Sequence, residues 1–428
     1  MDSSLRLLLF LRMAWGIQRV IWLGAAGLIG LSAQPESRAA PFIETPSAQI
    51  VLGESLFNTV WAPAGTPGVA HRGLGPVFNA ASCTACHANG GPGKGPTADG
   101  AVPAALVIEL QTPAAEAGAE AGGDPLYGRV FNTAATDGVQ AEGVVTVRYQ
   151  EMGGRYYPDG MRWRMRVPHY QLTGLTHGPL AEQTVIKPRL APALFGAGLL
   201  EAVPASALGS ASTARVRGRF GWQGESVSIR DQTSKALARE MGLTTSEIPR
   251  DDCTAAEADC QGKPSDGGAE VPPELVDALV AFVRSIAVPA ASGRHERSTE
   301  GAELFATLGC AACHRPELPV ELADATGTKG TAVIAPYTDL QLHDLGIEMA
   351  DENAAGKKVP SRWRTAPFWG LGYRTRTESH PTFLHDGRAR SLEEAILWHS
   401  GEAAPARRNL MDLWSRPRET LLGWVETL

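Results

Sequence analysis

The five-residue pattern C-x-x-C-H occurs twice in this chain, as Cys83–His87 and as Cys310–His314. In this pattern the two thiols bond to the vinyl groups of a haem, and the adjacent imidazole becomes a ligand of the iron. A zinc ribbon also uses paired cysteines, but its pairs lie tens of residues apart, not across most of a chain. A thioredoxin-type site needs a βαβ pattern that the sequence lacks. The motifs predict two covalently bound haem c groups, attached at Cys83, Cys86, Cys310 and Cys313, with His87 and His314 as iron ligands.

The two remaining cysteines, Cys253 and Cys260, lie only seven positions apart. In an oxidising compartment such a pair forms a local disulfide, which is the state that we predict for it. A redox-active dithiol is the alternative.

Residues 1–40 have the pattern of a secretory signal. Basic residues precede an apolar run over 20–31, and small residues follow it. The run is too short to span a bilayer comfortably, and an uncleaved membrane anchor is the alternative. Covalent haem attachment occurs outside the bacterial cytoplasm, so the segment and the motifs together predict export to the periplasm.

The composition is that of an ordinary globular protein, with 43% hydrophobic and 20% charged residues. The formal net charge of −7 argues against nucleic acid as a partner. The same charge suits docking to a basic electron carrier, although an acidic balance also serves solubility.

The chain contains a weak internal repeat, in which the sequence Gly53–Phe57 precedes the first motif and Gly301–Phe305 precedes the second. Each copy ends in an apolar helix, over 274–286 and 418–428. We therefore predict a mainly α fold of two cytochrome-c-like haem domains. Their predicted bounds are 41–289 and 299–428, joined by a linker at 290–298.

The first domain carries a predicted β-containing insertion. Residues 106–110 and 144–149 have the pattern of strands, and Pro158–Gly160 forms a hairpin turn between two further strands. The segment 114–124 is predicted to be a surface loop. In the second domain, the long segment 318–390 shows little regular pattern.

The second haem has a candidate for its other axial ligand. Ser391 and Glu394 form a predicted capping box, and the apolar positions of the following helix end at His399. His399 is thus the predicted partner of His314, which would make this haem low-spin. Weaker candidates for the same position are Met411, Met349, His343 and His385.

The first haem has no comparable partner. The loop that follows His87, residues 88–96, is rich in glycine and has no strong iron ligand. We therefore predict an open iron face that can bind peroxide or O₂. Residues that could still close this face are His169, His177, Met161 and Met165.

The chain resembles the di-haem c-type oxidoreductases of the bacterial cytochrome c peroxidase and MauG superfamily, and more narrowly the di-haem peroxidases often labelled thiol oxidoreductases. The resemblance covers nearly all of the mature chain. The segments that carry it are 73–79, 218–222, 231–232, 241–242, the Cys253/Cys260 pair, 336–339, 343–344, 363–365, 383–388 and 391–395.

The resemblance implies that the N-terminal haem is the peroxide or oxygen site and that the C-terminal haem delivers electrons, with His399 as its distal ligand. It also implies a Trp between the haems. Trp222 is the candidate and Trp163 the second, with core packing as the alternative role. Calcium occurs in relatives, but no dense Asp cluster supports it here. The resemblance also implies a glutamate that acts as acid and base in peroxide cleavage. The sequence offers Glu109, Glu151 and Glu225 for this role and does not distinguish among them.

The expected function is that of an exported haem oxidoreductase of peroxidase type. Its partners would be peroxide or O₂ and a small electron carrier of the cytochrome c or cupredoxin type. A di-haem cytochrome that only transfers electrons and a haem-dependent oxygenase are the alternatives. The sequence does not specify the substrate or the oligomeric state.

Overall fold

The computed structural model describes residues 47–113, 121–208, 218–261, 268–290, 298–323 and 328–428. The predicted signal segment lies outside these ranges, as do most of the predicted linker and most of the predicted surface loop at 114–124. The described residues belong to one compact unit, Pro46–Leu428. The predicted domain boundaries remain a prediction.

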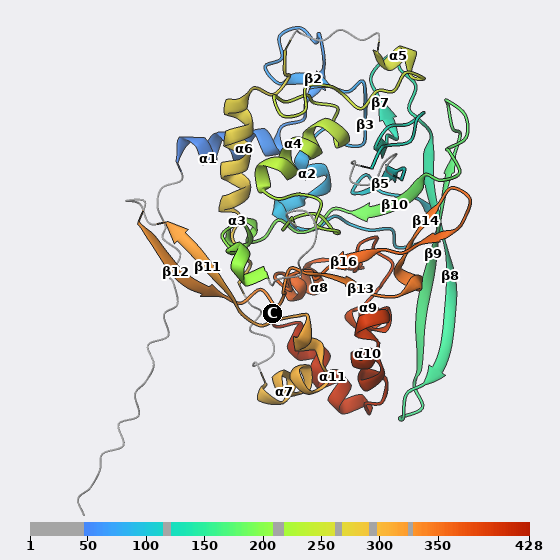
Figure 1. The fold of residues 1–428 in the computed structure, drawn as a ribbon, viewed down its shortest axis with the longest axis vertical. Coiled ribbons are helices and arrows are strands. Elements are labelled where there is room, and N and C mark those ends of the chain that lie inside the picture. Colours follow the sequence, from blue (N-terminus) through green and yellow to red (C-terminus); the bar gives the residue numbers. More distant parts are fainter. Residues whose placement is uncertain (1–46, 114–120, 209–217, 262–267, 291–297, 324–327) are drawn as a thin grey trace, which may run out of the picture. The chain divides into compact units, whose positions relative to one another are not determined.

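The described part of the chain contains both helices and strands, which occur in separate runs (Figure 1). The helices are α1 (Ala48–Asn58), α2 (Cys83–Cys86), α3 (Ala197–Glu201), α4 (Ile229–Glu240), α5 (Ala258–Gln261), α6 (Pro273–Ser285), α7 (Thr299–Thr307), α8 (Leu371–Thr377), α9 (Leu392–Leu397), α10 (Ala404–Met411) and α11 (Ser415–Val425). The strands are β1 (Ala62–Pro63), β2 (Arg72–Leu74), β3 (Val77–Phe78), β4 (Gly100–Ala101), β5 (Leu106–Gln111), β6 (Val130–Phe131), β7 (Ala134–Ala135), β8 (Val144–Tyr156), β9 (Arg162–Thr173), β10 (Val185–Leu190), β11 (Leu318–Ala323), β12 (Lys329–Ile334), β13 (Leu342–Asp344), β14 (Asp351–Asn353), β15 (Lys358–Val359) and β16 (Arg362–Arg364).

The prediction of a mainly α fold is wrong. Of the described residues, 30% are helical and 24% are in strands or bridges, and several sheets are present, so the fold is mixed α and β. The predicted strands of the insertion exist, but the segment 318–390 also contains six short strands. Strands β13 to β16 are two or three residues long, which is too short to show an alternation of apolar and polar residues. Strands β11 and β12 pair with each other as a local hairpin, and β11 begins with alternating buried and exposed positions.

In two helix pairs, a glycine from the repeated motif lies at the helix–helix contact. Helix α1 packs on α6, and a Cβ atom at Gly53 would overlap the carbonyl of Ala278. Helix α7 packs on α11, and a Cβ atom at Gly301 would overlap the side chain of Trp424. The repeat therefore marks the two places where a helix that precedes a haem motif closely approaches the last helix of its half (Figure 1).

A five-stranded sheet combines strands from both halves of the chain, in the order β15-β14-β10-β5-β6. Strand β10 pairs with β5 on one side and with β14 on the other. Arg189 of β10 and Asp351 of β14 form a buried bidentate ion pair, with N–O distances of 2.8 and 2.7 Å. The sheet thus ties the first half to the second.

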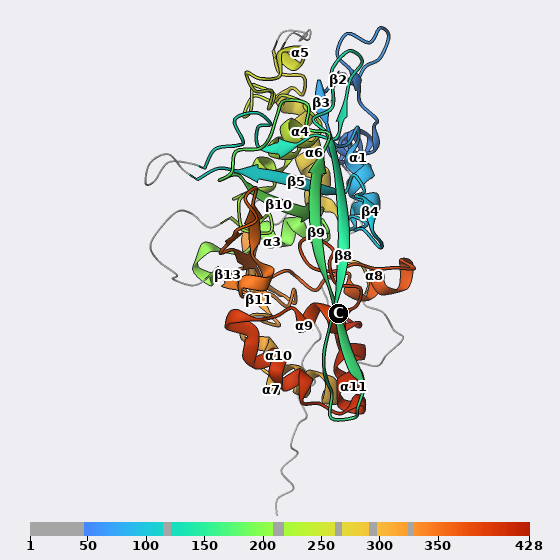
Figure 2. The same cartoon turned by 90° about the vertical axis from the view of Figure 1, so that its right-hand side faces the viewer.

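The long hairpin β8–β9 is a second connection between the halves (Figure 2). Its turn is the predicted one, and Asp159 there forms an ion pair with Arg418 of α11 at 3.0 Å. Arg166 of β9 is 2% exposed and donates hydrogen bonds to four backbone carbonyls, those of Pro96, Thr97, Gly387 and Arg388. This single side chain fixes the loop after the first haem motif against the loop before α9.

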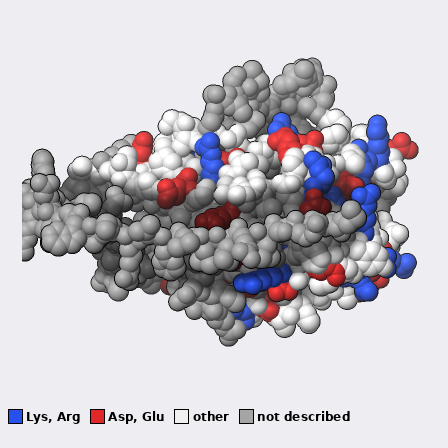
Figure 3. Space-filling model, turned by 90° about the horizontal axis from the view of Figure 1, so that it is seen from below, with Lys and Arg blue, Asp and Glu red and all other residues white. Residues whose placement is uncertain are grey.

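The apolar residues gather in separate clusters. The largest two lie around the α1/α6 pair and around the α7/α11 pair. Among the described residues, no helix has the length and apolar character needed to cross a membrane. On the face drawn in Figure 3, basic and acidic side chains are interspersed.

Candidate haem sites

One cavity of about 700 Å³ reaches both C-x-x-C-H motifs. Its walls are mainly apolar, which is typical of cofactor sites. The four motif cysteines line the cavity, none of them in a disulfide, together with His87 and His314. The structure therefore brings the two predicted haem sites to a common space, although more than 220 positions separate them in the sequence.

The first motif forms the short helix α2, and His87 follows directly at its end. Burial lowers the pKa of His87 to about 4, so the imidazole is neutral at physiological pH. A neutral imidazole has the lone pair that an iron ligand needs. The loop after His87 is held by backbone bonds from Gly93 N to Ala191 O and from Leu194 N to Gly90 O.

The second motif lies between α7 and β11, and His314 faces His399. Nδ1 of His314 lies 3.0 Å from the carbonyl of Tyr337, and Nδ1 of His399 lies 2.8 Å from that of Ala395. These contacts place the proton on Nδ1 of each ring and leave Nε2 free, as is usual for metal-binding histidines. Burial lowers the pKa of both, to about 3 for His314.

The distance between these two rings fits a shared iron. Their centroids lie 6.4 Å apart. An axial iron–nitrogen bond is about 2 Å and an imidazole nitrogen lies roughly 1 Å from its ring centre, so two ligands of one iron have centroids about 6 Å apart. The pair His314 and His399 therefore has the separation that bis-His ligation requires.

The rival ligands of the second site differ in their surroundings. His343 is hydrogen-bonded to Asp339 at 3.0 Å and to Glu402 at 2.8 Å, and the bond to Asp339 is the main cause that raises its pKa to about 11. A protonated imidazole has no lone pair for iron. His385 stacks on Trp363. Met349 lines the cavity, whereas Met411 does not.

A buried guanidinium supplies a further test of whether haem fits. Arg364 lines the cavity, is 8% exposed and forms no ion pair with a carboxylate in the described part of the chain. It donates instead to the carbonyl of Gly221 at 2.8 Å, and burial lowers its pKa to about 10. A buried cation at a cavity wall that lacks a direct carboxylate partner suits an anionic group in that cavity, such as a haem propionate.

The candidates to close the first iron face lie elsewhere. His169 is exposed on β9 beside Gln150, and none of His169, His177, Met161 and Met165 lines the cavity. Met241 does line it, although no pattern in the sequence marked this residue as an iron ligand. It lies in the apolar cluster against which Cys83 packs.

Helix α4 places a carboxyl group in the cavity that sequence reasoning missed. Gln232, Ala236 and Glu240 fall at spacings of four on one face of α4, and all three line the cavity. Burial raises the pKa of Glu240 to about 8, and the Asn79 side chain donates to its carboxylate at 3.5 Å. The signal in the sequence that could have identified Glu240 is its helical spacing from Gln232, which places the two polar side chains on one face of the same helix.

The three predicted candidates for the acid/base Glu do not line the cavity. Glu109 pairs with Lys187, and Glu151 pairs with Arg390. Glu225 is exposed and accepts a hydrogen bond from a neighbouring backbone amide. The carboxyl groups that do line the cavity are those of Glu240 and of Glu402, and Glu402 is paired with His343.

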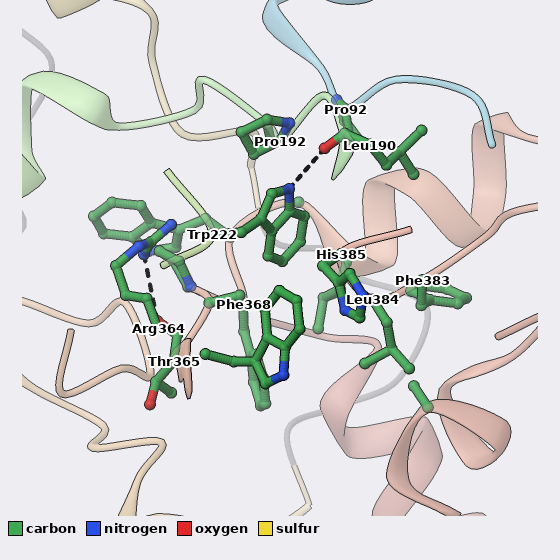
Figure 4. A pocket seen from close by; sticks show the side chains of 18 of the residues that line it. Pro92, Leu190, Pro192, Trp222, Arg364, Thr365, Phe368, Phe383, Leu384 and His385 are labelled. Atoms are coloured by element: carbon green, nitrogen blue, oxygen red, sulfur yellow. Dashed lines mark hydrogen bonds between the residues drawn. The ribbon is translucent and has the colours of Figure 1, made fainter. Parts of the chain in front are cut away.

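Trp222 lies at the cavity wall, as Figure 4 shows, and its Nε1 donates to the carbonyl of Leu190 at 2.7 Å. Trp163, the second candidate, packs beside Gly154 of the long hairpin and does not line the cavity. The geometry thus favours Trp222 as the residue between the two sites, which stays a prediction.

Two other sequence expectations concern cysteines and metal ions. Cys253 and Cys260 lie side by side, with Cα atoms 5.8 Å apart, a separation that a disulfide allows. Among the described residues, Cys313, Asp339 and His343 come close enough together to hold a metal ion. Because Cys313 belongs to a haem motif and calcium prefers oxygen ligands, this group does not support a calcium site.

Comparison with known proteins identifies a family that the chain matches. A family model described as "Di-haem oxidoreductase, putative peroxidase" matches residues 207–428. No curated protein matches the chain. A structure of Kuenenia stuttgartiensis hydrazine synthase, pressurized with 20 bar xenon, aligns with a TM-score of 0.33 at 14% identity, over 56% of this chain and 73% of that one. A likeness of that size carries no argument about this chain.

Proposed function

This chain belongs to the family of di-haem oxidoreductases, and from that premise we propose that it is an exported enzyme of peroxidase type. His87 would hold the haem that supplies the chemistry with peroxide, and His314 and His399 would hold the haem that supplies electrons. The observation that carries the proposal is the inequality of the two sites. The second has two facing imidazoles, whereas the first has one imidazole and a carboxyl group.

The residues that would hold the two groups follow from the cavity walls. Cys83, Cys86 and His87 bind one haem c, and Cys310, Cys313, His314 and His399 bind the other. Arg364 is placed to neutralise a propionate. Haem iron, when bound, supplies the redox chemistry, and the protein sets ligation, access and electron path.

Glu240 is the proposed proton carrier of the first site. Reduction of hydrogen peroxide requires that one oxygen loses a proton and that the departing oxygen gains one. An ionised carboxylate can do both in turn, and a pKa of about 8 places Glu240 close to the operating pH. Asn79 holds the carboxylate by its amide, and Gln232 offers a second polar group on the same helix face.

Export and the partners are part of the same proposal. The signal pattern at residues 1–40 supports a periplasmic location, with an uncleaved anchor as the alternative. A small carrier of the cytochrome c or cupredoxin type would deliver electrons to the second haem. Peroxide is the proposed oxidant, and O₂ is its rival at the same open face.

Stopped-flow spectroscopy of the haem-loaded, half-reduced protein tests this proposal. Peroxide should change the spectrum of a high-spin haem within the mixing experiment, and Glu240→Gln should slow that change. Asp231→Asn, on the same helix but outside the cavity lining, is the matched control. A high-spin haem that does not respond to peroxide would refute peroxidase chemistry.

One observation favours a second candidate function, that of a pure electron-transfer cytochrome. Met241 lines the cavity, and its thioether could close the first iron face. Electron paramagnetic resonance separates the two functions. Two low-spin signals, one of which is lost in Met241→Leu, would favour the cytochrome, and one high-spin signal unchanged in that variant favours the enzyme.

A further inference from the structure

A second buried carboxyl group lies in the β-containing insertion of the first half, away from the cavity. Glu142 lies between β7 and β8 and is 1% exposed. Its side chain accepts from the backbone amide of Asn132 at 2.7 Å and from the side-chain nitrogen of Asn132 at 3.3 Å. The backbone amide of Glu142 donates in return to the carbonyl of Asn132 at 3.0 Å. Glu142 therefore fixes Asn132 from both its side chain and its backbone.

Glu142 makes these contacts as an uncharged group. Burial raises its pKa to about 9, the hydrogen bonds from Asn132 act against burial, and the neighbouring carboxyl group of Glu257 raises the pKa further. Glu257 is 2% exposed and accepts from the backbone amide of Thr254 at 2.6 Å. Its other oxygen, Oε1, is buried and receives no hydrogen bond from another described group, which leaves it free to accept the proton of Glu142. At physiological pH Glu142 thus donates to Glu257 while it accepts from Asn132.

Asn79 is held by the segment that Glu142 fixes. The pairing of β3 with β7 brings Asn79 opposite Thr133. The side-chain oxygen of Asn79 accepts from the backbone amide and from the hydroxyl of Thr133, each at 3.1 Å. Its side-chain nitrogen donates to the carbonyl of Phe131 at 3.2 Å and to the side-chain oxygen of Asn132 at 3.3 Å. Both polar atoms of the Asn79 side chain are therefore fixed by the insertion.

Asn79 in turn holds the end of helix α4. Its backbone amide donates to the carbonyl of Glu240 at 2.8 Å, and the backbone amide of Ala80 donates to the same carbonyl at 3.2 Å. The last carbonyls of a helix have no partner within the helix, so these two bonds stabilise a helix end that would otherwise fray. The side-chain nitrogen of Asn79 also lies 3.5 Å from the carboxylate of Glu240. A displacement of Asn79 would thus move both the backbone and the carboxyl group of Glu240.

We propose that Glu142 is a positioning residue for Glu240, which it fixes at the cavity through Asn132, Thr133 and Asn79. The inference rests on the proton-carrying role proposed for Glu240, and it gives the β-containing insertion a function in the first haem site. Because Glu142 is protonated, it holds Glu240 in place without adding a second negative charge to this buried region.

Two substitutions of Glu142 test the positioning role in the haem-loaded protein. Glu142→Gln keeps an oxygen that accepts from Asn132 and an N–H group that donates to Glu257, as the protonated acid does. Glu142→Leu removes all of these side-chain bonds. Misplacement of a reacting group by about 1 Å can cost on the order of a hundredfold in rate. In stopped-flow measurements Glu142→Leu should therefore slow the reaction with peroxide by about tenfold or more, whereas Glu142→Gln should stay within about threefold of wild type.

The matched control is Asp124→Asn, which alters another buried carboxylate of the same insertion. Asp124 is 2% exposed, and its hydrogen bonds come from Leu126, Ala181 and Thr184. This variant should lower Tm but leave the rate with peroxide unchanged. A rate that falls with Tm equally in Asp124→Asn and Glu142→Leu would overturn the inference, as would equal slowing in Glu142→Gln.

A variant of the middle link keeps the test decisive if Glu142→Leu does not fold or does not load haem. Asn79→Ser removes the side-chain bonds to the insertion and to the carboxylate of Glu240. It should slow the reaction by about tenfold or more as well. A wild-type rate in Asn79→Ser would overturn the inference.

Infrared difference spectra supply a readout that needs no peroxide and that a general loss of stability does not move. Reduced-minus-oxidised spectra are recorded at mildly acidic pH, below the raised pKa of Glu240, and the C=O band that Glu240→Gln removes is assigned to this residue. The band frequency depends on the hydrogen bonds of the carboxyl group. The band should shift in Glu142→Leu and keep its position in Glu142→Gln and in Asp124→Asn.

The two readouts separate this inference from the proposed function. If peroxide does not react with the wild-type protein but the band shifts as expected, the positioning role stands and the peroxidase function falls. If peroxide reacts but the band keeps its position in Glu142→Leu, the function stands and the positioning role falls.

Discussion

Asp351→Asn should be among the most destabilising single changes in the described part of the chain. Asp351 is 5% exposed and accepts two hydrogen bonds from Arg189 and a third from the hydroxyl of Ser361. The asparagine keeps the shape but removes the negative charge. Arg189 then remains buried without a counter-ion between strands β10 and β14.

The magnitude follows from the burial of both partners. Removal of one partner from a buried ion pair costs about 3–5 kcal/mol, because the other charge is left uncompensated. The compact unit runs from Pro46 to Leu428, and for a unit of that size the entropy of unfolding is about 0.8 kcal/mol per kelvin. Calorimetry should therefore show a Tm lower by about 5 °C.

The neighbouring residue offers a matched control. Glu352 forms an exposed ion pair with Lys358 at 2.8 Å, and such pairs contribute at most about 1 kcal/mol. Glu352→Gln should lower Tm by about 1 °C. A double variant, Arg189→Met with Asp351→Leu, should recover most of the loss, since apolar replacement of a buried pair is often neutral. A Tm of Asp351→Asn equal to that of Glu352→Gln would refute the reasoning.

The contribution of Asp351 to the stability of the folded state should change with pH in a definite direction. Burial alone would raise the pKa of Asp351, but the charge of Arg189 and its hydrogen bonds outweigh burial and lower it. The ionised carboxylate therefore stabilises the folded state at pH values above its unfolded pKa, about 3.9. This contribution is lost as the pH falls through the lowered value. The Tm difference between wild type and Asp351→Asn should shrink as the protein is acidified below about pH 4.

Four further outcomes are expected. His399→Ala should convert one haem from low-spin to high-spin in electron paramagnetic resonance, and an unchanged spectrum would exclude His399 as a ligand. The reaction with peroxide should accelerate as the pH rises through about 8, because only the ionised Glu240 accepts a proton, and Glu240→Gln should remove this dependence. Gly301→Ala should destabilise by about 1–3 kcal/mol in thermal unfolding because its Cβ overlaps Trp424. Gly423→Ala, in open space on α11, should instead stabilise by about 0.5–1 kcal/mol.

Local signals in the sequence predicted local structure. The helix predicted at 274–286 is α6, and the predicted hairpin turn at Pro158–Gly160 joins β8 to β9. Ser391 caps α9 by accepting from the amide of Glu394. The other half of the predicted capping box is absent, because the carboxylate of Glu394 accepts from the backbone amides of Arg166 and Arg390 instead. The hydrogen bond from Arg166 links two segments that are remote in the sequence, so the spacing of Ser391 and Glu394 could not reveal it.

Non-local pairing explains what the sequence did not predict. Strand β10 lies between β5 and β14, one about 80 and the other about 160 positions away, and a six-residue strand buried on both sides carries no register information. His385 was considered only as a rival ligand, because its stacking on Trp363 depends on where two distant loops meet. Glu240 could have been found, because its spacing from Gln232 lies within one helix.

The inequality of the two sites has its origin in two helices that occupy the same place in the repeated order. Helix α4 precedes α6 in the first half, and α9 precedes α11 in the second, each with a serine at its N-terminus that caps it. The residue just beyond α9 that faces the cavity is a histidine, whereas α4 presents an amide and a carboxyl group, and the residue just beyond α4 is Met241. An imidazole can hold iron in a closed, six-coordinate state, and a carboxyl group can move protons but leaves the iron accessible. In the proposed division of labour, the side chains of one helix in each half would give the two sites their different functions, and strands β10 and β14 join the halves that carry those two helices.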